Sequence, residues 1–72
     1  MKTNEIFSSR LKTLMIERNV SQSELARKVN IRRGDMSHYY HGHYIPKAII
    51  LLKICKVLDT TPNYLLGFDK DE

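Results

Sequence analysis

"VSQSELARKVNIRRGDMSHYY", residues 20–40, contains the signals that begin and end two consecutive short helices. Ser21 is followed three positions later by Glu24, which is the spacing of a capping box at a helix start. This helix is expected to run to about Val29. Asn30 follows, and its side chain tolerates the left-handed conformation found at helix ends. The expected buried side chains of the helix are Leu25, Ala26 and Val29.

The second of these helices follows a tight turn and is basic. Ile31 is expected to anchor the turn, and Met36 and Tyr39 recur at helical spacing until Gly42 ends the helix. The small side chain of Ala26 falls where the two helices approach most closely. Two short helices joined by a tight turn, the second of them basic, are the arrangement of a helix-turn-helix DNA-binding unit.

A longer helix is expected before this unit and another after it. The first begins near Thr3 or Asn4, either of which can cap it, and stops at Asn19. The one after the unit accepts Pro46 in its first turn. Their expected buried side chains are Phe7, Leu11, Leu14 and Met15 in the first, and Leu51, Leu52, Ile54, Cys55 and Leu58 in the second.

A short last helix, from Pro62 to Gly67, completes an all-α chain, because no segment alternates apolar and polar residues long enough to predict a strand. The length of 72 residues suits one small domain. We therefore expect a compact domain of five helices over residues 1–67, followed by an acidic tail or the start of a linker over residues 68–72.

Composition and charge limit the possible compartments and partners. The lone Cys55 cannot form an intrachain disulfide, the start "MKTNEIFSSR" has no apolar signal core, and the apolar run "AIILL" is too short to cross a bilayer. We therefore expect a cytoplasmic protein. The net charge of the chain is +4. Basic residues are in excess over residues 1–47 and acidic residues slightly in excess beyond them, which suits a polyanionic partner.

Neither a metal site nor an enzyme active site is expected. His38, His41 and His43 have no cysteine or carboxylate nearby to complete a metal site, so they are expected to be surface residues. No cofactor is expected, and no paired carboxylates or serine-histidine arrangement predict an enzyme. Tyr39 is expected in the core. For Tyr40 and Tyr44, the alternatives of phosphate binding and simple packing stay open.

At the level of whole phrases, the sequence resembles the phage repressor and Cro type helix-turn-helix transcription regulators. "SQSELARKVNI" is similar to that family's second helix, and "PKAIILLKICKVLDTTPNYLLG" to its fourth and fifth. The likeness extends from Phe7 to Gly67. It implies a repressor-like DNA-binding domain that binds double-stranded DNA, usually as a dimer on a palindromic operator, with the third helix in the major groove.

The resemblance also implies roles for individual residues. Gln22 at the start of the second helix would contact a phosphate. The positions assigned to bases or flanking phosphates are Arg32, Arg33, Gly34, Ser37 and His38. The positions assigned to the loop along the sugar-phosphate backbone are His41, His43, Tyr44 and Lys47. Among them Arg33 is the strongest candidate for reading a guanine, because a guanidinium can donate to both O6 and N7.

Two departures from the family pattern affect these roles. Tyr40 stands where a glutamate commonly pairs with an arginine of the first helix, here Arg10, so we expect Arg10 to be free for phosphate. Arg32 replaces a usual capping serine or threonine. A third helix that starts one residue later than the family pattern stays an open alternative, and it would reassign the base-reading residues.

The helix around residues 48–58 is apolar nearly all round, which predicts a second neighbour and hence a homodimer. The candidate contact residues are Ile49, Ile50, Val57, Tyr64, Leu65 and Phe68. The favoured function is a sequence-specific transcriptional regulator, most simply a repressor. The alternatives are a protein-binding module, such as an antitoxin whose DNA binding is autoregulatory, and a domain of a longer regulator.

Overall fold

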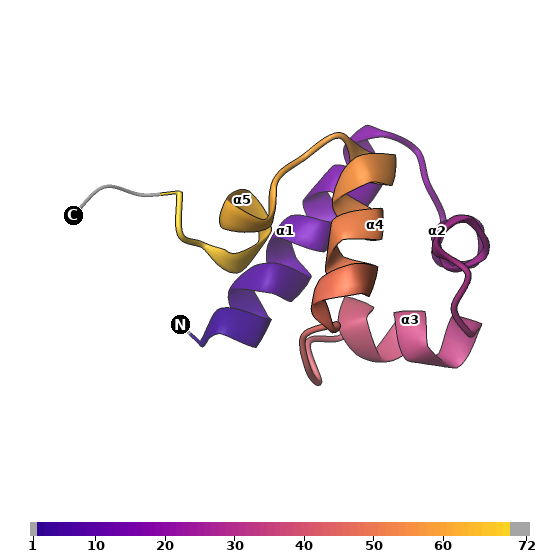
Figure 1. Cartoon of the computed structure of the whole chain (residues 1–72), viewed down its shortest axis with the longest axis horizontal. Coiled ribbons are helices and arrows are strands. Elements are labelled where there is room, and N and C mark those ends of the chain that lie inside the picture. Colours follow the sequence, from indigo (N-terminus) through magenta and orange to yellow (C-terminus); the bar gives the residue numbers. More distant parts are fainter. Residues whose placement is uncertain (1, 70–72) are drawn as a thin grey trace.

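The computed structural model describes residues 2–69, and these form five helices without a strand. In chain order they are α1 (Thr3–Glu17), α2 (Gln22–Val29), α3 (Arg33–Tyr40), α4 (Ala48–Leu58) and α5 (Pro62–Leu66). Figure 1 shows α2 and α3 at one end of the molecule and α5 at the other, with α4 between them and packed against α2 and α5. The predicted all-α fold of five helices is therefore confirmed. Residues 70–72 of the predicted tail lie outside the described residues.

One hydrophobic core joins all five helices. Its buried apolar side chains are Phe7, Leu11, Leu14, Met15, Leu25, Ala26, Val29, Met36, Tyr39, Leu51, Ile54, Cys55, Leu58 and Leu65. Tyr39 therefore belongs to the core as predicted. The prediction for Leu52 is wrong, because this side chain is 56% exposed. Leu51, Ile54 and Leu58 follow one another at helical spacing, and a residue directly after Leu51 points away from their face.

The ends of α2 follow the predicted local signals. Ser21 Oγ accepts a hydrogen bond of 3.1 Å from the backbone amide of Glu24. The Glu24 carboxylate lies 3.6 Å from Lys28 Nζ, and among the hydrogen bonds of residues 2–69 only the Ser21 half of the capping box is present. Asn30 has the predicted left-handed conformation, with φ of 61°, and Ile31 N donates to Ala26 O to close the turn into α3.

Two predicted helix starts differ in the structure. The N-cap of α1 is Lys2, whose amide donates to the Glu5 carboxylate at 3.2 Å, so neither Thr3 nor Asn4 is the cap. Pro46 is buried and precedes the N-cap of α4, which is Lys47, so it does not lie in the first turn. Proline disfavours helical geometry in the residue before it, so Ile45 stays in the loop.

The short helix α5 has a start and an end that agree with the prediction. Thr61 Oγ1 accepts from the amide of Tyr64 at 3.1 Å, and Pro62 occupies the first turn. Gly67 ends the helix with φ of 81°, and a Cβ there would lie 2.9 Å from an Ile6 side-chain carbon. This close approach fixes α5 against α1. None of the helices in residues 2–69 is long and apolar enough to cross a membrane.

Candidate nucleic-acid interface

The outer face of α3 brings several predicted DNA-binding residues together. Arg33, Gly34, Ser37 and His38 recur at spacings of one, three and four, while Met36 points the other way into the core. Three of the four are exposed and Ser37 is partly exposed. Arg32 is the N-cap of α3 and makes no side-chain capping bond, so α3 begins at Arg33. We call Arg33, Gly34, Ser37 and His38 the outer face of α3.

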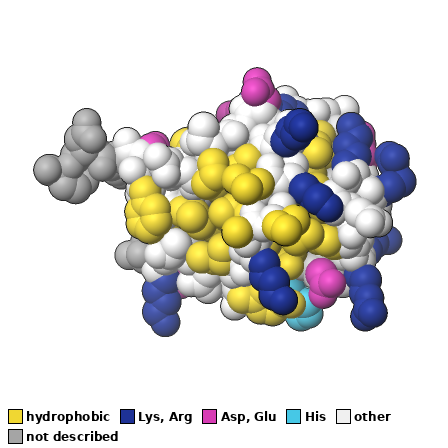
Figure 2. Space-filling view, viewed as in Figure 1, with side chains coloured by type: hydrophobic (Ala, Val, Ile, Leu, Met, Phe, Trp, Pro, Cys, Tyr) yellow, Lys and Arg dark blue, Asp and Glu magenta, His cyan; other side chains and the backbone are white. Residues whose placement is uncertain are grey.

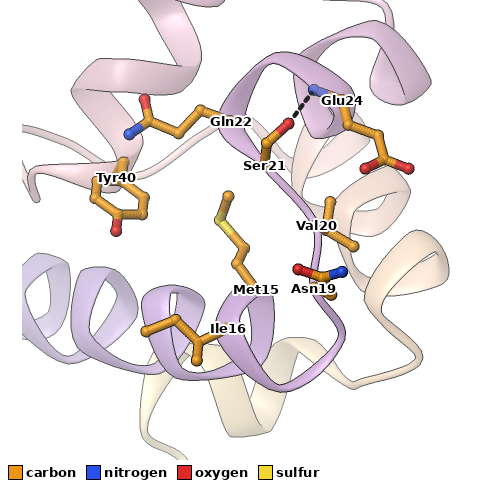
Figure 3. A pocket seen from close by; sticks show the side chains of 8 residues that line it. All are labelled: Met15, Ile16, Asn19, Val20, Ser21, Gln22, Glu24 and Tyr40. Atoms are coloured by element: carbon orange, nitrogen blue, oxygen red, sulfur yellow. Dashed lines mark hydrogen bonds between the residues drawn. The ribbon is translucent and has the colours of Figure 1, made fainter.

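Gln22 is the first residue of α2 and lies beside the end of α3. It lines an open cavity of about 420 Å³ together with Met15, Ile16 and Tyr40, and Figure 3 shows the Gln22 amide extending toward Tyr40. The first amides of α2 are unpaired within the helix and attract anions. Glu24 borders the same cavity, and its negative charge works against anion binding there.

The loop after α3 is fixed by two hydrogen bonds that the sequence analysis missed. Asn4 Nδ2 on α1 donates to Gly42 O at 2.6 Å, and Ser8 Oγ donates to Tyr40 O at 2.7 Å. The Tyr40 carbonyl is at the end of α3 and has no partner within the helix, and the Gly42 carbonyl belongs to the loop that follows. A buried serine on the apolar face of the first helix was the one available signal.

The aromatic residues near the end of α3 pack against one another. The Tyr44 ring contacts the rings of Tyr39 and His38, at centroid distances of 5.5 and 5.4 Å, and yet Tyr44 is 46% exposed. Tyr40 is partly buried, and the Lys12 ammonium lies 5.1 Å from its ring centroid. Packing is therefore observed for both tyrosines.

The histidines predicted to be surface residues are exposed, and two of them are joined. His38 Nδ1 and His43 Nδ1 lie 2.8 Å apart, with the ring centroids separated by 5.0 Å. The His41 ring centroid is 6.1 Å from that of His43. Across residues 2–69, no group of three or more histidine, cysteine or acidic side chains is placed to hold a metal ion. Lys47, the last predicted loop contact, is exposed as the N-cap of α4.

The prediction that Arg10 is free for phosphate is wrong. Its guanidinium donates to Tyr64 O at 2.6 Å and to Asp69 Oδ1 at 2.7 Å, and it lies 4.4 Å from the Tyr64 ring centroid. These contacts hold Arg10 against α5, at the opposite end of the molecule from α2 (Figure 1). The α1 residues near Tyr40 are Ser8, Lys12, Met15 and Ile16, so Arg10 is not the helix-one residue that faces Tyr40.

The predicted dimer surface is only partly exposed. Ile49 is 68% and Phe68 66% exposed, whereas Ile50, Val57 and Tyr64 are partly buried against the core. Leu65 on α5 is fully buried, so its assignment to this surface is wrong. Leu52 joins Ile49 on the exposed side of α4, and Figure 2 shows hydrophobic side chains gathered over this helix. We call Ile49 and Leu52 the α4 patch.

Two core groups have raised pKa values. Burial raises the pKa of the Cys55 thiol, which keeps it protonated and unreactive at neutral pH. Burial also raises the pKa of the Tyr39 hydroxyl, and the Asp35 carboxylate and the Tyr44 hydroxyl raise it further. Neither group therefore carries charge toward the outer face of α3.

Comparison with known proteins relates this arrangement to a family. Residues 10–71 match the Cro/C1-type HTH DNA-binding domain. The HTH-type transcriptional regulator ImmR of Bacillus subtilis is 33% identical over 61 residues, which are 85% of this chain and 48% of ImmR. An uncharacterized HTH-type transcriptional regulator of Archaeoglobus fulgidus is 30% identical over 64 residues, 89% of this chain and 90% of that protein.

The chain thus spans about half the length of ImmR. No solved structure matches it significantly. The family match begins within α1 and covers all of α2, α3, α4 and α5, and it agrees with the helix-turn-helix arrangement of α2 and α3. The family is one of DNA-binding transcriptional regulators and is not an enzyme class. The chain belongs to the Cro/C1-type helix-turn-helix DNA-binding family.

Proposed function

We propose that this protein is a cytoplasmic repressor that binds a palindromic operator as a homodimer, with α3 in the major groove. The observation that carries the proposal is the outer face of α3. There Arg33, Ser37 and His38 project from one side of an α-helix, the element that the major groove is wide enough to admit, whereas Met36 and Tyr39 hold the other side in the core.

In this proposal, base contacts and backbone contacts come from different elements. Arg33 donates two hydrogen bonds to a guanine, and Gln22 binds a phosphate at the N-terminus of α2. Ser37 and His38 read neighbouring bases, and Gly34 lets the backbone of α3 approach the DNA. The proposed phosphate contacts outside α2 and α3 are Arg32, His41, His43, Tyr44 and Lys47. Arg10 no longer belongs to this set because it pairs with Asp69.

The proposed dimer contact is the α4 patch, with Phe68 as a further exposed apolar side chain. A two-fold dimer places two copies of α3 one turn of DNA apart, roughly 34 to 36 Å. We also propose that the DNA-binding domain ends at Gly67, which terminates α5, and that residues 68–72 are a tail or the start of a linker.

Selection of bound duplexes from a random library at near-physiological salt tests the proposal. The expected result is a two-fold symmetric motif, because a two-fold dimer binds a palindromic site. Near-physiological salt weakens binding that depends on charge alone, so a motif recovered there reports specific binding. A folded helical protein that enriches no sequence contradicts the proposal and favours a protein-binding module such as an antitoxin. A single unrepeated half-site contradicts the dimer alone.

A further inference from the structure

His38 and His43 are joined twice, once through the backbone and once through the side chains. The amide of His43 donates to the carbonyl oxygen of His38 at 3.0 Å, and the two Nδ1 atoms lie 2.8 Å apart. A neutral imidazole has one N–H donor and one bare acceptor nitrogen. At this separation one Nδ1 must therefore donate the proton and the other must accept it.

This bond determines what the free nitrogen of His38 offers. If His38 Nδ1 accepts, its Nε2 carries the proton and donates; if His38 Nδ1 donates, its Nε2 is bare and accepts. The ring is also in contact with Tyr44, at a centroid distance of 5.4 Å and an interplanar angle of 33°. An exposed side chain on the outer face of α3 is thus held in orientation, and its tautomer is coupled to that of His43.

We infer that His43 is a positioning residue for base recognition by His38, an inference that rests on the proposed function. His43 does not read the base. It couples the tautomer of His38 to its own and orients the ring, so the two histidines act as one unit. The loop that carries His43 is itself fixed to α1, because Asn4 donates to Gly42 O and Ser8 donates to Tyr40 O.

The inference connects two independent measurements. Nitrogen-15 NMR of the free protein reports which nitrogen of His38 carries the proton. A donor Nε2 must go with an acceptor at the selected base edge, such as guanine N7 or O6 or thymine O4. A bare Nε2 must go with a donor, adenine N6 or cytosine N4. A mismatch between tautomer and selected base overturns the inference.

The variant H43A tests the role of His43 in a library selection, with H41A as the matched control on the same loop. H43A is expected to lose about two- to tenfold of the base preference at one motif position, as H38A does, with no further loss in the double variant. H41A, at a proposed phosphate contact, is expected to weaken binding to all sequences nearly equally and to keep the base preference. H43N, whose amide can both donate and accept, is expected to restore part of it.

Circular dichroism and thermal unfolding show whether H43A is folded, and H43N supplies a second test of the same bond. A uniform loss of affinity in H43A, with the base preference unchanged at every position, overturns the inference. A wild-type chain that selects no motif contradicts the proposed function itself. A wild-type motif that H43A leaves unaltered contradicts only the role of His43.

Discussion

The hydroxyl of Ser8 on α1 donates a 2.7 Å hydrogen bond to the carbonyl oxygen of Tyr40, the last residue of α3. Ser8 is 6% exposed, and loss of its hydroxyl leaves a partly buried carbonyl without this partner. We expect Ser8→Ala to lower the free energy of unfolding by about 1 to 3 kcal/mol. Urea unfolding measures it. Ser9→Ala, at the exposed neighbour, is the control, and equal losses in both variants would contradict a role for the bond.

Arg33 and Gln22 are expected to fail in different ways when truncated. Arg33→Ala should weaken binding to the preferred site by about 1 to 3 kcal/mol and blur one base position. Gln22→Ala should weaken binding to all sequences nearly equally, because a phosphate contact carries no sequence information. Titration of each variant with the selected and a scrambled duplex measures both. Equal losses on the two duplexes for both variants would refute the assignment.

Gly34 offers a substitution that separates stability from binding. A Cβ at this position meets no atom within 4 Å, and glycine in a helix is less stable than alanine by up to about 1 kcal/mol. Gly34→Ala should therefore raise the free energy of unfolding. It should also lower DNA affinity, because the added methyl group stands on the outer face of α3. Unchanged affinity in a stabilised variant would remove Gly34 from the interface.

The α4 patch is open to a direct test of the dimer. Leu52 is 56% exposed and adjoins Lys53, so Leu52→Lys adds a like charge to the proposed contact without disturbing the core. We expect the variant to sediment as a monomer at concentrations where the wild type is dimeric. The matched control is Ile16→Lys, at a 75% exposed isoleucine on α1. A dimer that survives Leu52→Lys would exclude this patch.

Alkaline pH should destabilise the fold. Because burial raises the pKa of the Cys55 thiol, the unfolded chain loses this proton first as pH rises past about 8.5. The folded state then binds more protons than the unfolded state, and the free energy of unfolding falls with pH. The raised pKa of Tyr39 extends the decline to higher pH. Urea unfolding at neutral and alkaline pH should show a shallower decline for Cys55→Ala, and an unaltered slope would contradict it.

The helix boundaries could be predicted where the signal is local. Ser21, Asn30 and Gly67 act on their own turn of backbone, so their roles follow from neighbouring residues. The prediction that Leu52 on α4 is buried was wrong for a different reason. That helix is apolar nearly all round, and only its packing against α2 and α5 decides which side is buried.

In the candidate site, too, the features set by local sequence could be predicted and the long-range contacts could not. Spacing placed Arg33, Ser37 and His38 on one face, because a helical period is a local property. The ion pair of Arg10 with Asp69 spans most of the chain, and no periodicity links residues so far apart. The bond between His38 and His43 depends on the turn at Gly42, whose geometry the sequence pattern did not specify.

Helix α1 holds two distant parts of the molecule from positions two residues apart. Ser8 donates a hydrogen bond to the end of α3, and Arg10 donates hydrogen bonds to Tyr64 on α5 and to Asp69. Helix α1 thus links the end of α3 to α5 mechanically. The position of Asp69 is therefore set relative to the end of α3. A displacement of Asp69 would be passed through α1 to the end of α3, the helix proposed to enter the major groove.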